Sequence, residues 1–308
     1  MVKGSSFWVN SLYVLSAFLL VTSLLVPYGG NVSGLSVIDD YKYLRAGIGL
    51  LCIIAAAVPV FIISSLATKR AISSNISVVL FFILSLVSSD SIYFSYTHLS
   101  LIAFAWGQFF ILNEDNFKAL FLTTIAALLV PELMWVVPIM LVASAVGRGD
   151  LPRTLVINLS GVVLPVLYLL VYRHILYKDS LDYIYIFWDS MANVSSPVLS
   201  LSFTNIFLVV VVALMILHSS LSIISSHSQN NIATENVLRV ELISAVLLGG
   251  VYILFWGDGS SCLNILLAFP ASLILSNLFT VKKYSAAFKI ELIVFICAVI
   301  LYRLHFFI

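Results

Sequence analysis

Long apolar runs separated by short polar turns follow one another along the whole chain. An apolar run of about 20 residues can cross a hydrocarbon core of about 30 Å as an α-helix, which satisfies its own backbone hydrogen bonds. The runs predict eleven membrane spans, over residues 8–27, 44–66, 75–88, 93–112, 117–130, 133–146, 155–172, 199–217, 237–256, 263–280 and 286–302.

Three of the expected spans are short. Residues 75–88, 117–130 and 133–146 would each form a helix of about 14 residues, roughly 21 Å long at a rise of 1.5 Å per residue. Such helices must be packed inside a bundle, enter the membrane partway or meet a thinned bilayer. The predicted number of spans is therefore eleven, to within one or two.

Composition agrees with this pattern. The 308 residues are 62% hydrophobic and 9% charged, whereas soluble domains have about 45–50% apolar and about 25% charged residues. No polar stretch is long enough to form a separate soluble domain. The sequence therefore predicts an all-α polytopic transmembrane helix bundle that forms a single integral membrane domain over residues 1–308.

Charge adds an orientation and argues against one class of partner. With the N-terminus in the cytoplasm, ten Lys and Arg residues fall on the inner side of the expected spans and five on the outer side, the bias that orients membrane proteins. A net charge of +1 argues against nucleic-acid binding, which needs concentrated cations. Three widely spaced cysteines without a CxxC motif predict no metal site.

The stretch GLSVIDDYKYLRAG places two adjacent acids and a cation at the outer entrance to the second expected span. Asp39 or Asp40 could act as a general base or hold a divalent cation that binds a phosphate, and Arg45 could contact that phosphate. The alternative is a solvated loop whose acids cap the following helix, because negative charge is favourable at a helix N-terminus. The residues alone leave both interpretations open.

The stretch SSDSIYFSYTHLS links Asp90 to His98. Residues eight apart in one continuous helix are roughly 12 Å from each other, so direct pairing would need a break near Ser91. An ionisable residue inside a span is a candidate functional residue. Alternatively, His98 is a buried histidine that bonds to a neighbouring helix.

The stretch LLVPELMWVVP separates two short apolar arms. Pro131 cannot continue the preceding helix, which puts Glu132 near the outer leaflet, with Trp135 one turn further in. An acid between two short helices is similar to the broken-helix sites of transporters. A tight hairpin with a solvated acid is the alternative.

Two polar segments are expected outside the spans. Residues 173–198 form the longest outer loop, whose aromatic side chains predict that it lies on the membrane surface. Arg173, His174 and Lys178 at its start could receive the anionic headgroup of a lipid, with simple anchoring as the alternative. Residues 218–236 are polar without metal-ligand spacing and are expected to form a cytoplasmic linker. The terminal LYRLHFFI is expected to be an interfacial tail.

The chain resembles a family of uncharacterised polytopic inner-membrane proteins of Bacteroidetes. The likeness lies in YTHLSLIAFAWGQFFIL, FKALFLTTIAALLVPELMWVVPIMLVASAVGRGDLPRTLVINLSGVVLPVLYLLVYRHI and NILLAFPASLILSNLFTVKKYSAAFKIELIVF. These stretches cover most of the chain from the fourth expected span onward. The resemblance implies a location in the bacterial inner membrane and brings no known activity.

The chain also resembles the GT-C class of membrane glycosyltransferases, which use polyprenyl-phosphate-linked sugars. The likeness consists of an acid in the first outer loop followed by a tyrosine and an alanine entering the second span, as in DDYKYLRAG, together with short middle helices. It implies that Asp39 or Asp40 is the catalytic carboxylate, with Arg45 or Arg173 near the phosphate. Fold analogy by itself does not establish an activity.

Three functional hypotheses follow. Five acids are expected at helix ends on one side, with cations available for a phosphate: Asp39, Asp40, Asp90, Glu132 and Asp258. This arrangement favours a GT-C-like transferase or another protein that handles lipid-linked sugar. Apolar faces with small residues, as in AFPASL, fit a structural or assembly subunit whose partners are membrane proteins of the cell envelope. The third hypothesis is a transporter that uses Glu132 or His98, which would need polar groups at mid-membrane depth.

Overall fold

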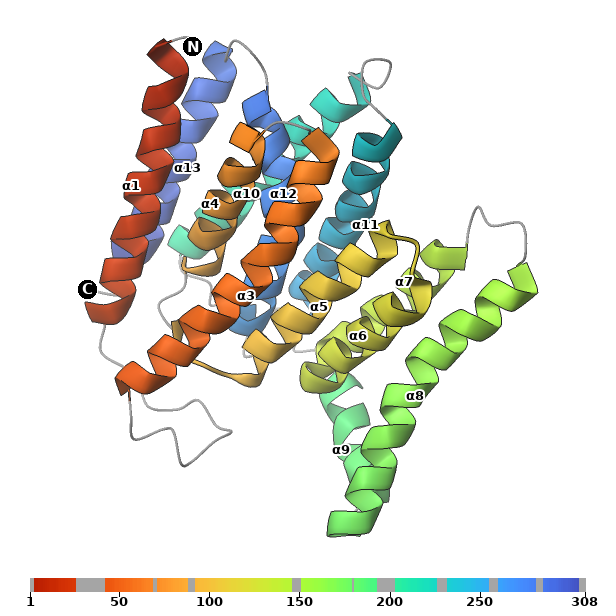
Figure 1. Cartoon of the computed structure of the whole chain (residues 1–308). Coiled ribbons are helices and arrows are strands. Elements are labelled where there is room, and N and C mark those ends of the chain that lie inside the picture. Colours follow the sequence, from red (N-terminus) through yellow and green to blue (C-terminus); the bar gives the residue numbers. More distant parts are fainter. Residues whose placement is uncertain are drawn as a thin grey trace. The chain divides into compact units, whose positions relative to one another are not determined.

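The computed structural model describes residues 3–25, 42–68, 71–87, 92–145, 151–178, 180–192, 203–225, 232–254, 260–280 and 285–304. These residues form α-helices and short 3-10 helices, without a strand in the described part of the chain (Figure 1). The α-helices are α1 Lys3–Leu25, α3 Lys42–Thr68, α4 Ala71–Ser85, α5 Tyr96–Leu112, α6 Asn116–Leu129, α7 Val136–Ala145, α8 Leu151–Tyr177, α9 Ser180–Ala192, α10 Phe203–Ser225, α11 Ile232–Leu254, α12 Ser260–Ser276 and α13 Ala286–Leu304. The two 3-10 helices are η2 Pro131–Trp135 and η4 Asn277–Thr280.

The all-α class predicted from the sequence is confirmed for these residues, and every expected span overlaps a helix. Three described helices are long and apolar enough to cross a membrane, over Phe7–Leu24, Tyr43–Leu66 and Arg153–Tyr177. Several of the other expected spans fall on shorter apolar helices. The number of about eleven spans and the inner position of the N-terminus stay predictions.

Two segments expected outside the spans contain regular helix. The segment 173–198 carries the end of α8 and then α9. The segment 218–236 is helical at both ends, because α10 continues to Ser225 and α11 begins at Ile232. The segment of α9 is rich in aromatic and aliphatic residues, whereas residues 218–225 of α10 alternate serines with Leu221, Ile223 and Ile224, so both segments are amphipathic enough to form a helix.

The chain divides into two compact units. Unit 1 consists of Met1–Ser95, Val198–Val246 and Leu267–Ile308, and unit 2 consists of Tyr96–Pro197 and Leu247–Leu266. The sequence-based expectation of one membrane domain remains a prediction.

In unit 1, α3 packs against α4, α4 against α1, and α10 against α13. The first and the last described helices of the chain, α1 and α13, lie side by side and run in the same direction (Figure 1). Their C-terminal turns are joined because Arg303 Nε donates to Thr22 Oγ1 at 3.0 Å. The sequence predicts an interfacial tail over LYRLHFFI. For Arg303 this expectation is wrong, because its side chain is fully buried.

A second feature of unit 1 is a close backbone approach at the start of α3. Arg45 Nε donates to Phe94 O at 2.8 Å, and the Phe94 N–H donates to Arg45 O at 3.2 Å. One turn further along α3, a Cβ at Gly49 would overlap Ile92 O and lie 2.9 Å from Phe94 N. Only glycine allows the segment 92–95 before α5 to lie this near the helix.

Unit 2 is built around α6, which packs against α5 on one side and α8 on another. Glycines permit both contacts. A Cβ at Gly107 of α5 would lie 2.8 Å from Thr123 Oγ1, and a Cβ at Gly161 of α8 would lie 2.9 Å from Phe117 O. Ser100 Oγ of α5 also donates to Ala126 O at 2.9 Å. Small residues and interhelical hydrogen bonds of this kind are typical of helix packing in membranes.

Candidate functional site

The break after α6 is set by its sequence. Val130 has an extended backbone (φ −132°, ψ 94°), as expected of a residue before proline, and Pro131 starts η2. Glu132 follows in the first turn of η2 and is partly buried, and this burial raises the pKa of its carboxyl above the ordinary value. At the end of η2, Trp135 Nε1 donates to Met191 O at 3.2 Å, which ties the turn to α9.

Helix α9 also contacts α8. The guanidinium carbon of Arg173 lies 4.4 Å from the ring centre of Tyr183 and 5.3 Å from that of Tyr177. Stacking on two rings holds this half-buried cation in one place. His174 and Lys178 are exposed beside it, and Lys178 ends α8 in a left-handed conformation, with φ 57°.

The site residues predicted from the sequence lie in different parts of the structure. Asp39, Asp40, Asp90 and Asp258 lie outside the described residues. Arg45 belongs to unit 1, is 4% exposed and uses its Nε for the carbonyl of Phe94. In unit 2, by contrast, the turn that carries Glu132 and the helix that carries Arg173, His174 and Lys178 both contact α9.

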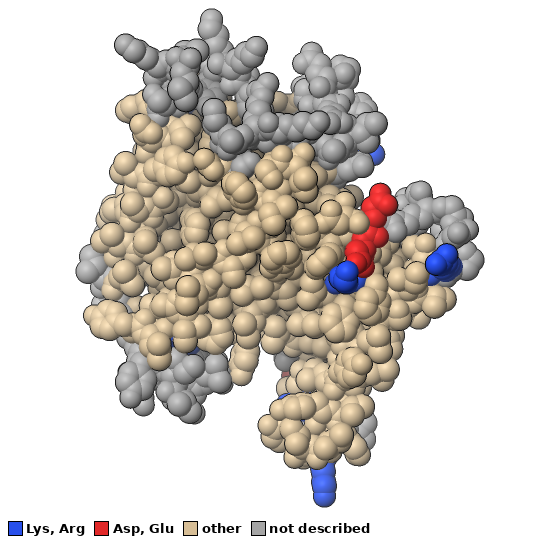
Figure 2. All heavy atoms as spheres, viewed as in Figure 1, with Lys and Arg blue, Asp and Glu red and all other residues tan. Residues whose placement is uncertain are grey.

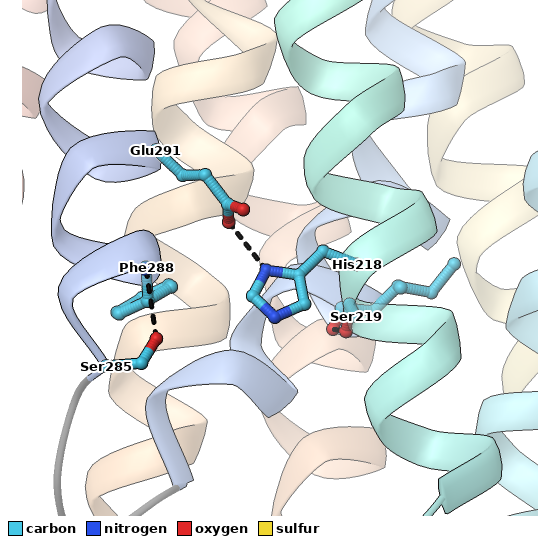
Figure 3. A network of polar contacts seen from close by, with 6 residues as sticks. His218, Ser219, Ser285, Phe288 and Glu291 are labelled. Carbon is cyan, nitrogen blue, oxygen red and sulfur yellow. Dashed lines mark hydrogen bonds and ion pairs between the residues drawn. The ribbon is translucent and has the colours of Figure 1, made fainter.

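A hydrogen-bonded pair that the sequence did not reveal lies in unit 1. His218 of α10 and Glu291 of α13 point toward each other, with 2.7 Å between His218 Nδ1 and Glu291 Oε2 (Figure 3). Next to it, Ser219 Oγ donates to Ile274 O at 2.7 Å, and the Phe288 N–H donates to Ser285 Oγ at 3.1 Å (Figure 3). The partners are 73 residues apart, so spacing along the chain carried no signal for the pair.

Two further polar residues stand in the apolar interior of unit 1. Arg303 is held by Thr22, Ser23 and the carbonyl of Leu19. Glu241 of α11 is fully buried, and neither carboxylate oxygen has a hydrogen-bond partner among the described residues. A charged residue inside an otherwise apolar run was the available sequence signal for both.

Charges are sparse on the visible surface as well. On the face drawn in Figure 2, few described side chains are Lys, Arg, Asp or Glu. Among the described residues no group of three or more His, Cys, Asp or Glu side chains could hold a metal ion. Of the described cysteines, Cys52 is buried and Cys297 is exposed, and both are free thiols.

Comparison of the chain with family models, with curated proteins and with solved structures gave no match. Functional inference therefore rests on the residues and their geometry.

Proposed function

We propose that the chain is a multi-pass protein of the bacterial inner membrane that handles a polyprenyl-phosphate-linked sugar at the outer face, as a GT-C-like transferase does. One observation carries the proposal: α9 contacts both η2, which bears Glu132, and the end of α8, which bears Arg173. A carboxylate and a held cation therefore border the same short helix of unit 2. That combination suits a phosphate and the sugar attached to it.

The aromatic surface of α9 supports the same proposal. Tyr185 and Trp188 are largely exposed, together with Ile184 and Ile186. Aromatic and aliphatic side chains of this kind favour the headgroup level of a membrane, where a lipid-linked substrate presents its phosphate. Arg173 would contact that phosphate, with His174 and Lys178 close along the chain.

The proposed chemistry assigns the catalytic carboxylate to Asp39 or Asp40, with Asp90 and Glu132 in support. The carboxylate would accept the proton of the acceptor hydroxyl while the bond between sugar and phosphate breaks, and polyprenyl phosphate would leave. Burial raises the pKa of the Glu132 carboxyl above its ordinary value, which favours the protonated form and suits this residue to a supporting role in proton transfer. A divalent cation would assist at the phosphate if the acids of the first outer loop hold one.

The experiment compares binding of a polyprenyl phosphate and the corresponding polyprenol to the protein in nanodiscs, by native mass spectrometry. We expect the phosphate to bind at least tenfold more tightly, and Arg173→Gln to remove most of that preference. Arg153→Gln is the matched control, because Arg153 is exposed near the other end of α8. Equal binding of phosphate and polyprenol, or an equal loss in both variants, would contradict the proposal.

A second candidate function is a non-enzymatic assembly subunit of a cell-envelope complex. It is favoured by α8, because only 17% of its apolar span is buried within the described protein. Such a helix face must be covered by lipid or by partner helices. Co-purification of a defined envelope membrane protein after mild solubilisation, lost with Leu167→Arg on the exposed face of α8, is the result that this function requires.

A further inference from the structure

An open, apolar groove runs between α1 and α13, both of which belong to unit 1. Its volume is about 580 Å³. From α13, Ile296 and Ile300 line the groove one helical turn apart. From α1, the lining residues recur every three or four positions and are Phe7, Asn10, Ser11, Val14, Leu15 and Phe18. Residues at that spacing share one face of a helix, so the groove follows the axis of α1.

The bond between the two helices closes one end of the groove. Thr22 lies one turn beyond Phe18 of α1, and it accepts from Arg303, which lies one turn beyond Ile300 of α13. At this end the helices are therefore joined through a single side chain. A further helix, which is about 10–12 Å across, cannot pass between them here, whereas a hydrocarbon chain can reach as far as this point.

The length of the groove matches one leaflet of a membrane. Phe18 follows Phe7 by 11 positions, which corresponds to roughly 16 Å along a helix. The hydrocarbon core is about 30 Å thick, so one leaflet contributes about 15 Å. The groove also begins where the candidate span Phe7–Leu24 begins, at one surface of the membrane. The tail of one lipid fits this length, whereas a partner helix that spans the membrane needs a contact surface about twice as long.

The lining of the groove is suited to hydrocarbon. Leu15 is only 4% exposed and forms the floor, whereas Phe7 and Val14 stand on the rim with 65% and 70% of their surface exposed. The Ser11 hydroxyl donates to Trp8 O at 2.7 Å, so it requires no hydrogen bond from a ligand. None of the described lining residues carries a charge. The occupant is therefore an alkyl chain and not a headgroup.

Asn10 adds a polar group at the depth where a lipid has one. Its side chain is exposed in the groove, one turn deeper than Phe7. Phe7 contacts Trp8 edge to face, with 5.2 Å between ring centres, and aromatic side chains are favoured at the membrane interface. Below that interface a carboxamide needs a hydrogen-bond partner, and the ester carbonyl of a phospholipid supplies one. We infer that the groove between α1 and α13 binds one acyl chain of a phospholipid, with the ester carbonyl at Asn10.

The test locates lipid on the full chain in nanodiscs by photo-cross-linking and peptide mass spectrometry. The first probe is a phosphatidylethanolamine with a diazirine in one acyl chain, and the second is a polyprenyl phosphate with a diazirine in its isoprenoid chain. We expect the phospholipid to label the lining residues of α1 and α13 at least fivefold more than the exposed face of α8, which includes Val163 and Leu167. The polyprenyl phosphate should label the groove less than the phospholipid does.

Two valine-to-tryptophan changes on α1 form a matched pair. Val14→Trp places an indole in the groove and should lower its labelling at least fivefold. Val21→Trp is the control and should leave the labelling unchanged, because Val21 is 56% exposed on the same helix but lies beyond the end of the groove at Phe18. Both positions are exposed, so neither change disturbs the packed interior, and an unchanged unfolding temperature verifies this.

The contact at Asn10 is tested by competition between a phospholipid with ester-linked chains and one with ether-linked chains, which lacks the carbonyl. Retention in native mass spectrometry should favour the ester lipid at least threefold in the wild type and show no preference in Asn10→Leu. Equal retention of both lipids by the wild type would overturn the placement of the ester at Asn10.

Other results would overturn the acyl-chain site itself. Equal labelling of the groove and of α8, or an equal effect of both tryptophan variants, would mean that only the ordinary lipid shell covers α1. Preferential labelling by polyprenyl phosphate would identify a different lipid as the occupant, and no labelling of the groove by either probe would mean that protein covers it. The polyprenyl-phosphate proposal is tested separately, because it is read out at Arg173 in unit 2.

Discussion

Arg303 Nε donates to Thr22 Oγ1 at 3.0 Å, and this bond joins α13 to α1 across nearly the whole sequence. The guanidinium also donates to Ser23 Oγ and to Leu19 O. Both hydroxyls donate in turn to carbonyls of their own helix, Thr22 to Phe18 O at 2.9 Å and Ser23 to Leu19 O at 2.7 Å. Their lone pairs are therefore oriented to accept from the buried cation.

Replacing Thr22 by valine should destabilise unit 1. Thr22→Val keeps the shape of the side chain but removes the acceptor of a buried charged donor, so we expect a loss of about 1–3 kcal/mol in the free energy of unfolding. Unfolding in detergent micelles, followed by circular dichroism, measures it. Ser16→Ala is the control, because its exposed hydroxyl donates only to Tyr13 O, and it should change stability by less than about 0.5 kcal/mol. Equal losses would contradict the structural role of Arg303.

Gly47 and Gly49, both in α3, should respond in opposite ways to replacement by alanine. Gly49→Ala would force its Cβ against Ile92 O and Phe94 N, so α3 or the segment before α5 must move, and we expect poor folding or a loss of more than about 2 kcal/mol. Gly47→Ala meets nothing within 4 Å and should stabilise the helix by up to about 1 kcal/mol. Thermal unfolding of the two purified variants tests the pair, and a tolerated Gly49→Ala would argue against the close approach.

Replacing Glu241 by leucine should stabilise the protein. A fully buried carboxyl without a hydrogen-bond partner among the described residues is costly, so Glu241→Leu should raise the free energy of unfolding by about 1–3 kcal/mol. Glu291→Leu is the comparison, because its half-buried pair with His218 should contribute at most about 1 kcal/mol. Marked destabilisation by Glu241→Leu would instead mean that the carboxyl binds a group that stabilises it.

The cap of α6 should make stability depend on acid pH. Lys118 lowers the pKa of the Asp115 carboxyl through a side-chain hydrogen bond, so the folded-state pKa lies below the unfolded value. The stabilisation is present above the unfolded pKa, about 4, and is lost as the pH falls through the folded pKa. Asp115→Ala should cost about 1 kcal/mol at pH 7 and less near pH 3. Unfolding of the wild type and of Asp115→Ala between pH 3 and pH 7 measures the difference in stability. A difference that does not change with pH would contradict the role of the Asp115 carboxylate as a cap.

The helices themselves could be predicted from the sequence because their cause is local. Apolar runs favour helices in a membrane, where every backbone group must be satisfied within its own segment. The break before Glu132 was predictable for the same reason, since Pro131 cannot continue α6. The additional helix α9 and the extension of α10 into the expected linker were not predicted, because short amphipathic or polar segments form helices only where they find something to pack against.

The pairing of residues was decided only by tertiary structure. The hydrogen-bonded pair of His218 and Glu291, the burial of Arg303 against Thr22, and the stacking of Arg173 on Tyr183 each bring together side chains from different helices. Apolar helices of similar length carry little information about which neighbour they choose, whereas close packing and hydrogen bonds between particular side chains select one arrangement. The sequence by itself determined that this protein is a set of apolar helices with a few polar positions, and packing determined which of those positions meet.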